Sequence, residues 1–257
     1  MTAISTQVMN FMIVGNHRSG YGVVQSSVDA HPEAVCHKGL LNKDKDVRQE
    51  HHVRYFGRAQ ADVPQWYDPQ TWKQFSIEQY LTTRVFDHPR YGENIVGVIA
   101  SYDEIDEVFL WEDLKERSMR GDFVIVHVKR NPLACFVSLQ QIRQCGVSDQ
   151  KLFIPSAVTI DAKELTEFCR SHDAHSERVS CLFEDRLEID YRELVLNYRE
   201  TMQETFDYLN LPPFPSVRPS TPRALNRKVK ARIVNWDQLR DSVPHDVLAH
   251  FDDKYLF

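Results

Sequence analysis

The stretch Phe11 to Gly22, FMIVGNHRSGYG, decides the fold of this chain. Its first four residues are apolar, as in a strand buried on both faces, and they run into a short polar turn that contains glycine. Val23, Val24 and Val28 follow at spacings that suit the inner face of a helix. We therefore expect a strand, a loop and a helix, the unit from which parallel α/β sheets are built.

The loop of this unit has the composition of an anion site. Four backbone N–H groups can converge on an anion at the positive end of the new helix, those of Ser19, Gly20, Tyr21 and Gly22. Arg18 adds a fixed positive charge, so a phosphate or a sulfonate is the natural ligand. By itself, such a turn also suits an ordinary connection in an α/β sheet.

Length, charge and cysteine content limit the classes of protein to which this chain can belong. The chain has 257 residues, 42% of them hydrophobic, and a formal net charge of −6. A folded globular protein is expected, and binding of nucleic acid through overall basic charge is excluded. The five cysteines are scattered without a C-x-x-C pair, which favours reduced thiols and no zinc site. Nothing before Phe11 is built like a signal peptide and no apolar run approaches about 18 residues, so we expect a cytoplasmic protein without a membrane span.

Further apolar segments alternate with helical ones along the chain. Strands are expected at 34–36, 95–100, 122–129 and 187–191, and helices at about 103–119, 132–145, 161–183 and 192–209. Asn131 can cap the second of these helices, with Pro132 at its first position. The alternation predicts an α/β fold, a P-loop-like parallel sheet flanked by helices, in a single domain over residues 1–257.

Residues from about 42 to 92 differ in composition from the rest of the chain. Charged residues are interleaved with aromatic ones, among them Trp66, Tyr67 and Trp72, and no single period fits. We expect an irregular, aromatic-rich insertion that covers the acceptor site. A peripheral helical subdomain packed by its own aromatic side chains is the alternative.

The stretch Val124 to Ser138, VIVHVKRNPLACFVS, places a second arginine at a strand end. Arg130 follows the strand directly, where α/β sheets bind their ligands, and its guanidinium fork suits phosphate oxygens. Ser138 comes eight residues later, about two helical turns, so both side chains can face one phosphate. The alternative is a surface arginine and an unrelated helix serine.

Three motifs occur in order along the chain: RSGYG after the first strand, KRNPLACFVS after a later strand, and IDYREL before a helix that ends FDYLNLPP. In this order they resemble the PAPS-dependent sulfotransferase family, in its bacterial small-molecule or carbohydrate branch. The resemblance extends in outline from Phe11 to about Ser242. It implies transfer of a sulfuryl group from PAPS to a hydroxyl or amine of a small molecule or carbohydrate, with PAP as the other product and no metal.

The resemblance also implies roles for individual residues. The 5′-phosphosulfate would be held by Arg18, Ser19, Gly20, Tyr21 and Gly22, and the 3′-phosphate by Arg130 and Ser138. Tyr191 matches the tyrosine of the family's Y-E-D-L segment, which commonly lies by the adenine; a core aromatic is the alternative. The family's C-terminal phosphate-contacting loop corresponds to a basic run, otherwise merely solvated, of Arg227, Lys228, Lys230 and Arg232.

Two departures from the family bear on the mechanism. Ser or Thr usually follows the RSG turn, where this chain has Tyr21 and Gly22, so backbone N–H groups must do more of the binding. The family's usual catalytic bases are also missing. The segment Cys36-His37-Lys38-Gly39 has no carboxylate where relatives read C-H-G-E, and the substrate strand has Ile99 and Ser101 in place of Lys or His.

Within the family scheme, Arg18 is expected to stabilise the charge that develops on the departing oxygen. His37 has a suitable pKa range for the proton acceptor; a structural histidine is the alternative, and His51, His52 and Asp103 are further candidates. A non-catalytic PAP- or PAPS-binding protein is the alternative function. A P-loop-type nucleotide kinase is disfavoured because residues 20–22 supply no Walker lysine followed by Ser or Thr. The sequence carries no signal for the oligomeric state.

Overall fold

The computed structural model describes residues 9–41, 81–86, 95–107, 110–121, 123–145, 157–215 and 228–252. Within these ranges the strands are β1 (Met9–Gly15), β2 (Ala34–His37), β3 (Ile95–Ser101), β4 (Phe123–Lys129) and β5 (Arg186–Asp190). The longer helices are α1 (Tyr21–Val28), α5 (Trp111–Met119), α6 (Pro132–Cys145), α7 (Ala162–Leu182) and α9 (Tyr198–Tyr208). The shorter segments are η2 (Leu81–Phe86), α4 (Tyr102–Glu107), α8 (Tyr191–Leu196), η4 (Val229–Arg232), α10 (Trp236–Ser242), α11 (His245–Leu248) and η5 (Ala249–Phe251).

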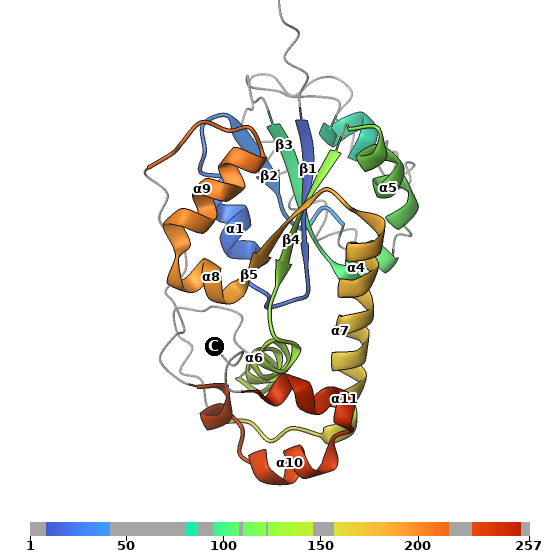
Figure 1. Cartoon of the computed structure of the whole chain (residues 1–257), viewed down its shortest axis with the longest axis vertical. Coiled ribbons are helices and arrows are strands. Elements are labelled where there is room, and N and C mark those ends of the chain that lie inside the picture. Colours follow the sequence, from blue (N-terminus) through green and yellow to red (C-terminus); the bar gives the residue numbers. More distant parts are fainter. Residues whose placement is uncertain are drawn as a thin grey trace, which may run out of the picture.

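The strands form one parallel sheet in the order β2-β3-β1-β4-β5, with β1 in the middle. Gly15, the last residue of β1, lies opposite Ser101 of β3 and Val128 of β4. Because the paired strands run in the same direction, their carboxyl ends lie together at the lower edge of the sheet in Figure 1. The loops that leave this edge are the ones that can build a common site.

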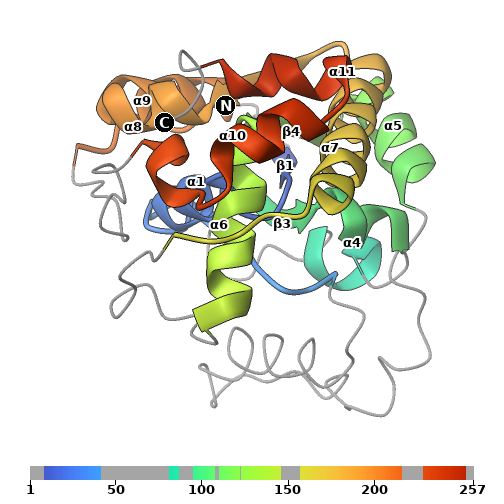
Figure 2. The same cartoon turned by 90° about the horizontal axis from the view of Figure 1, so that it is seen from below.

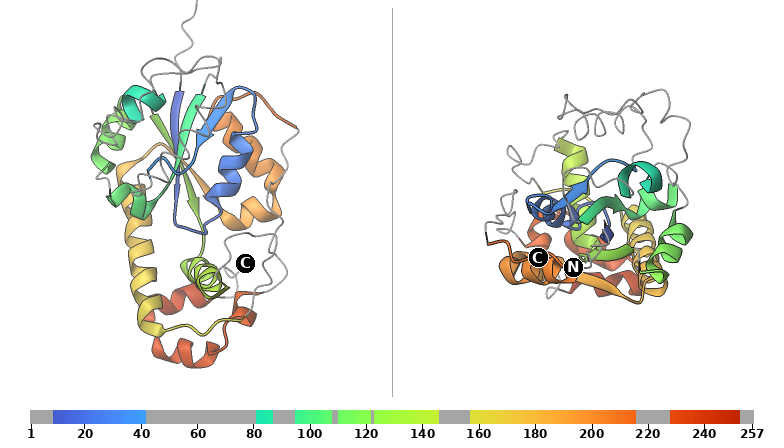
Figure 3. Two further views of the ribbon diagram at one scale, coloured as in Figure 1. Left: turned by 180° about the vertical axis from the view of Figure 1, so that it is seen from behind. Right: turned by 90° about the horizontal axis from the view of Figure 1, so that it is seen from above.

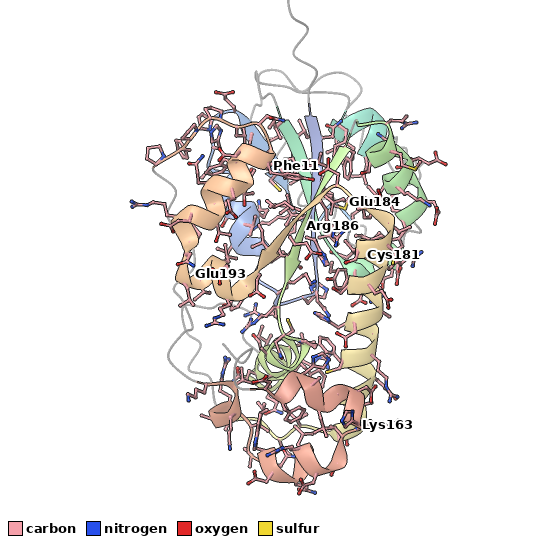
Figure 4. All side chains as sticks on the ribbon, in the orientation of Figure 1. Phe11, Lys163, Cys181, Glu184, Arg186 and Glu193 are labelled. Carbon is pink, nitrogen blue, oxygen red and sulfur yellow. The ribbon has the colours of Figure 1, made fainter. Side chains whose placement is uncertain are left out.

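Helices cover both faces of the sheet, as the front and back views show (Figures 1 and 3). The side chains of β1 alternate between the two faces. Phe11 and Ile13 pack with residues of α1 and α9, whereas Met12 and Val14 pack with residues of α4, α5 and α7. Phe11 is labelled among the strands in Figure 4. All four side chains are fully buried, which is why the strand needs an unbroken apolar run. This arrangement confirms the predicted α/β fold with a parallel sheet flanked by helices.

A third apolar cluster lies beyond the carboxyl edge of the sheet. It is formed by α6, α7 and the segment from η4 to η5, which lies beside α6 in the view from below (Figure 2). Polar contacts fix the same segment: Nδ2 of Asn131 donates to the carbonyl of His250 at 3.0 Å, and Arg170 pairs with Asp246 at 2.8 Å. The C-terminal segment is therefore held where its side chains can reach the strand ends.

The predicted start of α6 is confirmed, because Pro132 is its first residue and Oδ1 of Asn131 accepts a hydrogen bond from the N–H of Ala134 at 3.1 Å. The helix predicted at 103–119 is instead two helices, α4 and α5. The N–H of Leu110 turns back to the carbonyl of Ile105 at 3.2 Å, and both side chains are buried in the core.

The helix predicted at 192–209 also divides into two, α8 and α9, at Asn197. After this break, the hydroxyl of Tyr198 lies 2.6 Å from the hydroxyl of Ser27 on α1, which ties α9 to the first unit of the chain. The insertion predicted at about 42–92 lies outside the described residues except for residues 81–86. The buried side chains there, Leu81, Val85 and Phe86, belong to the core. That the insertion covers the acceptor site stays a prediction.

Candidate anion-binding site

The loop between β1 and α1 leaves the middle of the carboxyl edge. Two of its residues have a left-handed backbone, Arg18 with φ 71° and Gly20 with φ 99°. For a residue other than glycine this conformation costs roughly 1 kcal/mol or more, so the surrounding fold must hold Arg18 in place. Gly20 ends the loop, and its carbonyl accepts a hydrogen bond from the N–H of Val23 at 2.8 Å in the first turn of α1.

Gly20 and Gly22 stand two residues apart and differ sharply in their surroundings. A Cβ at Gly20 would lie 2.5 Å from the ring of Tyr191, and the positive φ adds backbone strain. A Cβ at Gly22 would meet no heavy atom within 4 Å. The loop therefore requires glycine at the first position and merely tolerates it at the second.

This difference gives a test of the loop. Gly20→Ala is expected to lower the free energy of unfolding by about 2–3 kcal/mol, because strain and a clash add. Gly22→Ala is expected to raise it by about 0.5–1 kcal/mol, because alanine favours the helix and restricts the unfolded chain. Urea unfolding of both variants beside the wild type measures the two changes. Equal losses in the two variants would contradict the described loop.

Arg130, at the end of β4, is held beside this loop. Its Nη1 donates to the carbonyl of Arg18 at 2.7 Å, and its guanidinium carbon lies 4.0 Å from the centre of the Tyr191 ring, a cation–π contact. Arg18 in turn donates from Nε to Oγ of Ser138 on α6 at 3.1 Å. The structure thus brings Arg18, Arg130, Ser138 and Tyr191 into one cluster.

A third arginine, Arg232 of η4, joins the cluster from the C-terminal segment. It is only 5% exposed, and its Nη1 donates to Oε1 of Gln141 on α6 at 3.2 Å. Burial, and then the charge of Arg130, lowers the pKa of Arg232 to about 10. Burial, and then the charge of Arg130, also lowers the pKa of Arg18. Burial and mutual repulsion both disfavour these charged side chains, and a bound anion would relieve both.

Oγ of Ser19 and Nε of Arg232 are buried atoms of this cluster that make no hydrogen bond within the described part of the chain. A buried donor without an acceptor is costly, at about 1–3 kcal/mol, and such groups are rare in folded proteins. Both are donors that the oxygens of a phosphate or sulfonate would satisfy. The cluster has the charge, the donors and the burial of an anion site.

The other predicted loop residues have identifiable surroundings. The hydroxyl of Tyr21 lies 3.2 Å from Nδ1 of His17, and its pKa is raised by burial and next by the nearby carboxylate of Glu104. Tyr191 lies between Gly20 and Arg130 as the first residue of α8. Its place by an adenine stays a prediction.

In the basic run, Arg227 falls outside the described residues. Lys228 is exposed just before η4. Among the described residues of this run, Arg232 enters the cluster. Four positive charges in six residues indicated a phosphate-contacting segment. Which of these side chains is buried depends on how η4 packs against α6.

His37, the predicted proton acceptor, is the last residue of β2 at the edge of the sheet. It lies opposite Val98, three positions before the end of β3. The order β2-β3-β1 places it two strands from β1, about 10 Å at the usual spacing of ~4.8 Å per strand. The structure does not bring His37 into the cluster of arginines.

One polar contact at the strand ends was missed. Ser101 and Glu104 form a reciprocal cap at the start of α4, in the S-x-x-E pattern that marks a helix start. The pattern can be read from the sequence, but its position beside the loop requires the pairing of β3 with β1.

Among the helices that the structure describes, none combines the length and the apolar character needed to cross a membrane.

The chain aligns with solved structures of sulfotransferases, among them the following three. A sulfotransferase domain from the curacin biosynthetic pathway aligns with a TM-score of 0.50 at 14% identity, over 86% of this chain and 81% of that chain. A sulfotransferase from Alicyclobacillus acidocaldarius gives 0.47 at 14% identity, over 96% and 95%. The sulfotransferase domain of the olefin synthase from Synechococcus PCC 7002 gives 0.45 at 17% identity, over 90% and 82%.

No curated protein matches the chain closely enough to count as a relative. The sequence model of the sulfotransferase family, however, matches residues 10–216. This range includes the β1–α1 loop, Arg130, Ser138 and Tyr191, and it covers most of the chain. The chain therefore belongs to the sulfotransferase family.

Proposed function

We propose that this protein transfers a sulfuryl group from PAPS to a hydroxyl or amine of a small molecule or carbohydrate. The observation that carries the proposal is the convergence of Arg18, Arg130 and Arg232, from three distant segments, on the place where Ser19 and Ser138 lie. The printed acceptors of Arg18 and Arg232 are uncharged, a serine hydroxyl and an amide oxygen. Positive charge held next to uncharged acceptors suits a ligand that carries several negative charges.

The compactness of the cluster suits an adenosine bisphosphate. Its 3′ and 5′ groups belong to one ribose, so the residues that hold them must be neighbours. Nε of Arg18 lies 3.1 Å from Oγ of Ser138. In the proposal, Arg18 and the backbone N–H groups of residues 19–22 hold the 5′ end, while Arg130, Ser138 and Arg232 hold the 3′-phosphate.

Sulfuryl transfer leaves charge on the oxygen that joins sulfur to the nucleotide. A guanidinium fixed beside that oxygen lowers the barrier because the charge develops next to a cation that needs no reorganisation. In the proposal Arg18 has this role; the loop holds its backbone and Ser138 orients its side chain, which supports the assignment. The buried, free thiols of Cys135 and Cys169 agree with a cytoplasmic setting.

Calorimetry with PAP tests the nucleotide site. We expect PAP to bind, and adenosine 5′-monophosphate, which lacks the 3′-phosphate, to bind about ten- to a hundredfold more weakly, because each charged hydrogen bond contributes about 1.5–3 kcal/mol. ATP with magnesium serves as the comparison for a kinase. Equal binding of PAP and adenosine 5′-monophosphate, or tighter binding of ATP, would remove the proposed 3′ site.

A PAP- or PAPS-binding protein without activity is the second candidate, since the family's usual bases are absent and His37 lies two strands from β1. Sulfate-labelled PAPS distinguishes the two. An enzyme moves the label to at least one member of a panel of alcohols, sugars and amines, or to water, whereas a binding protein retains the label on the nucleotide.

A further inference from the structure

The proposed transfer needs a group that accepts the proton of the acceptor, and the strand ends offer one. We infer that Glu104, in the first turn of α4, is this general base; the inference rests on the proposed function.

The carboxylate of Glu104 is fixed by its own helix start. Its Oε2 accepts hydrogen bonds from the backbone N–H of Ser101 at 2.8 Å and from the Ser101 hydroxyl at 3.0 Å. The backbone N–H of Glu104 lies 3.3 Å from the same hydroxyl, which closes the reciprocal cap. The two bonds from Ser101 both end on Oε2, and no described residue bonds to Oε1, which leaves that oxygen for a substrate. A base whose second oxygen is anchored keeps its direction during the reaction.

This carboxylate lies next to the donor loop. Ser101 is the last residue of β3 and lies opposite Gly15, the last residue of β1, so α4 and the loop leave neighbouring strands at the same level. Figure 1 shows α4 at the lower end of the sheet, where the loop also lies. Glu104 is close enough to Tyr21, at the start of α1, to contribute to its raised pKa after burial.

Position favours Glu104 over the histidine named from the sequence. β3 is the direct neighbour of β1, whereas β2, which carries His37, is one strand further away. His37 is 5% exposed, while Glu104 is half-buried and so can be reached by an acceptor. A base must lie within hydrogen-bond reach of the proton that it takes.

The proposed transfer forms one bond to sulfur and breaks another. The acceptor oxygen forms a bond to sulfur, and the bond from sulfur to the bridging oxygen of PAPS breaks. The electron pair of that bond stays on the phosphate oxygen of PAP, beside Arg18. The proton of the acceptor hydroxyl goes to Oε1 of Glu104, from which solvent removes it after product release.

Three variants test the inference. Glu104→Gln keeps the shape and can still accept the bonds from Ser101, but it cannot take a proton. Ser101→Ala removes the hydroxyl from the cap and leaves the carboxylate. Glu112→Gln changes an exposed carboxylate in the first turn of α5. Each is compared with the wild type in PAP affinity, in thermal unfolding midpoint, and in transfer of labelled sulfate from PAPS to water and to the acceptor panel.

We expect Glu104→Gln to bind PAP at least as tightly as the wild type and to lose transfer about a hundredfold, the usual contribution of a general base. Ser101→Ala keeps the carboxylate and the backbone bond to it, so it should lower the unfolding midpoint and reduce transfer far less than Glu104→Gln does, and Glu112→Gln should change neither. Transfer by Glu104→Gln within threefold of the wild type overturns the inference, as do equal losses in Glu104→Gln and Ser101→Ala, which would mean a capping role alone. A wild type that binds PAP but transfers to nothing also overturns it. A wild type that does not bind PAP contradicts instead the proposed function.

Discussion

Arg130→Ala is expected to bind PAP at least about a hundredfold more weakly than the wild type, since a lost charged fork and its phosphate bonds are together worth about 3 kcal/mol. Two effects add. The phosphate loses its bidentate partner, and the carbonyl of Arg18 loses the donor that lies 2.7 Å away. That second contact helps to hold a non-glycine residue at φ 71°, so its loss also loosens the 5′ loop. Calorimetry at fixed salt measures the change.

A matched control separates this effect from a change of net charge. Arg199→Ala removes an exposed arginine on α9 and is expected to leave PAP affinity unchanged within twofold. Arg130→Lys keeps the charge but lacks the planar fork and the stacking on Tyr191, so it should fall between the alanine variant and the wild type. PAP binding that is equally strong in Arg130→Ala and Arg199→Ala would show that the arginine cluster is not the nucleotide site.

Lowering the pH from 7 to 5 is expected to remove about 2 kcal/mol of unfolding free energy through His127 alone. This side chain on β4 is fully buried, with Nε2 2.6 Å from the hydroxyl of Tyr102. Burial, with a smaller contribution from Lys129, lowers the pKa of His127 to about 3 from its ordinary 6.5. Below pH 6.5 the unfolded chain therefore binds a proton at His127 that the folded chain does not bind, so the free energy of unfolding decreases as the pH is lowered. Above pH 6.5 this contribution vanishes.

The His127→Gln variant isolates this contribution. It should be less stable than the wild type at pH 7, because a buried contact is altered. It should also lose about 2 kcal/mol less on acidification to pH 5, because glutamine does not titrate. Urea unfolding at pH 7, 6 and 5 measures both quantities. His245→Gln, at an exposed histidine at the start of α11, should keep the acid sensitivity of the wild type. The same loss of stability between pH 7 and 5 in all three proteins would contradict a neutral, buried His127.

The elements whose signal is local could be predicted from the sequence. The apolar run before Gly15 reads as a buried strand because both of its faces are covered, and Asn131 with Pro132 marks a helix start whose bonds form within four residues. The loop between β1 and α1 and the arginine after β4 could also be predicted as site residues. Both follow the carboxyl end of a strand in a parallel sheet, where such sheets bind their ligands.

The parts that depend on packing could not be predicted. The breaks at Asn197 and before Trp111 follow from which side chains meet the sheet, and no periodic pattern in the sequence indicates them. The four basic residues of the run carry the same charge, and the contact with α6 shows that Arg232 is buried whereas Lys228 and Lys230 are exposed. His37 was named because a strand end was expected near the loop. The sheet order, which no single segment encodes, places β2 at the edge.

The order in which the arginines occur along the chain has a consequence for synthesis. Arg18 follows the first strand, whereas Arg232 belongs to η4, after the whole sheet and α9. A ribosome therefore releases the loop and Arg130 well before the last cation and the helices that hold it in place. On a nascent chain the complete set of three guanidinium groups cannot yet exist, so recognition of the nucleotide should begin only once translation of the C-terminal helices has ended.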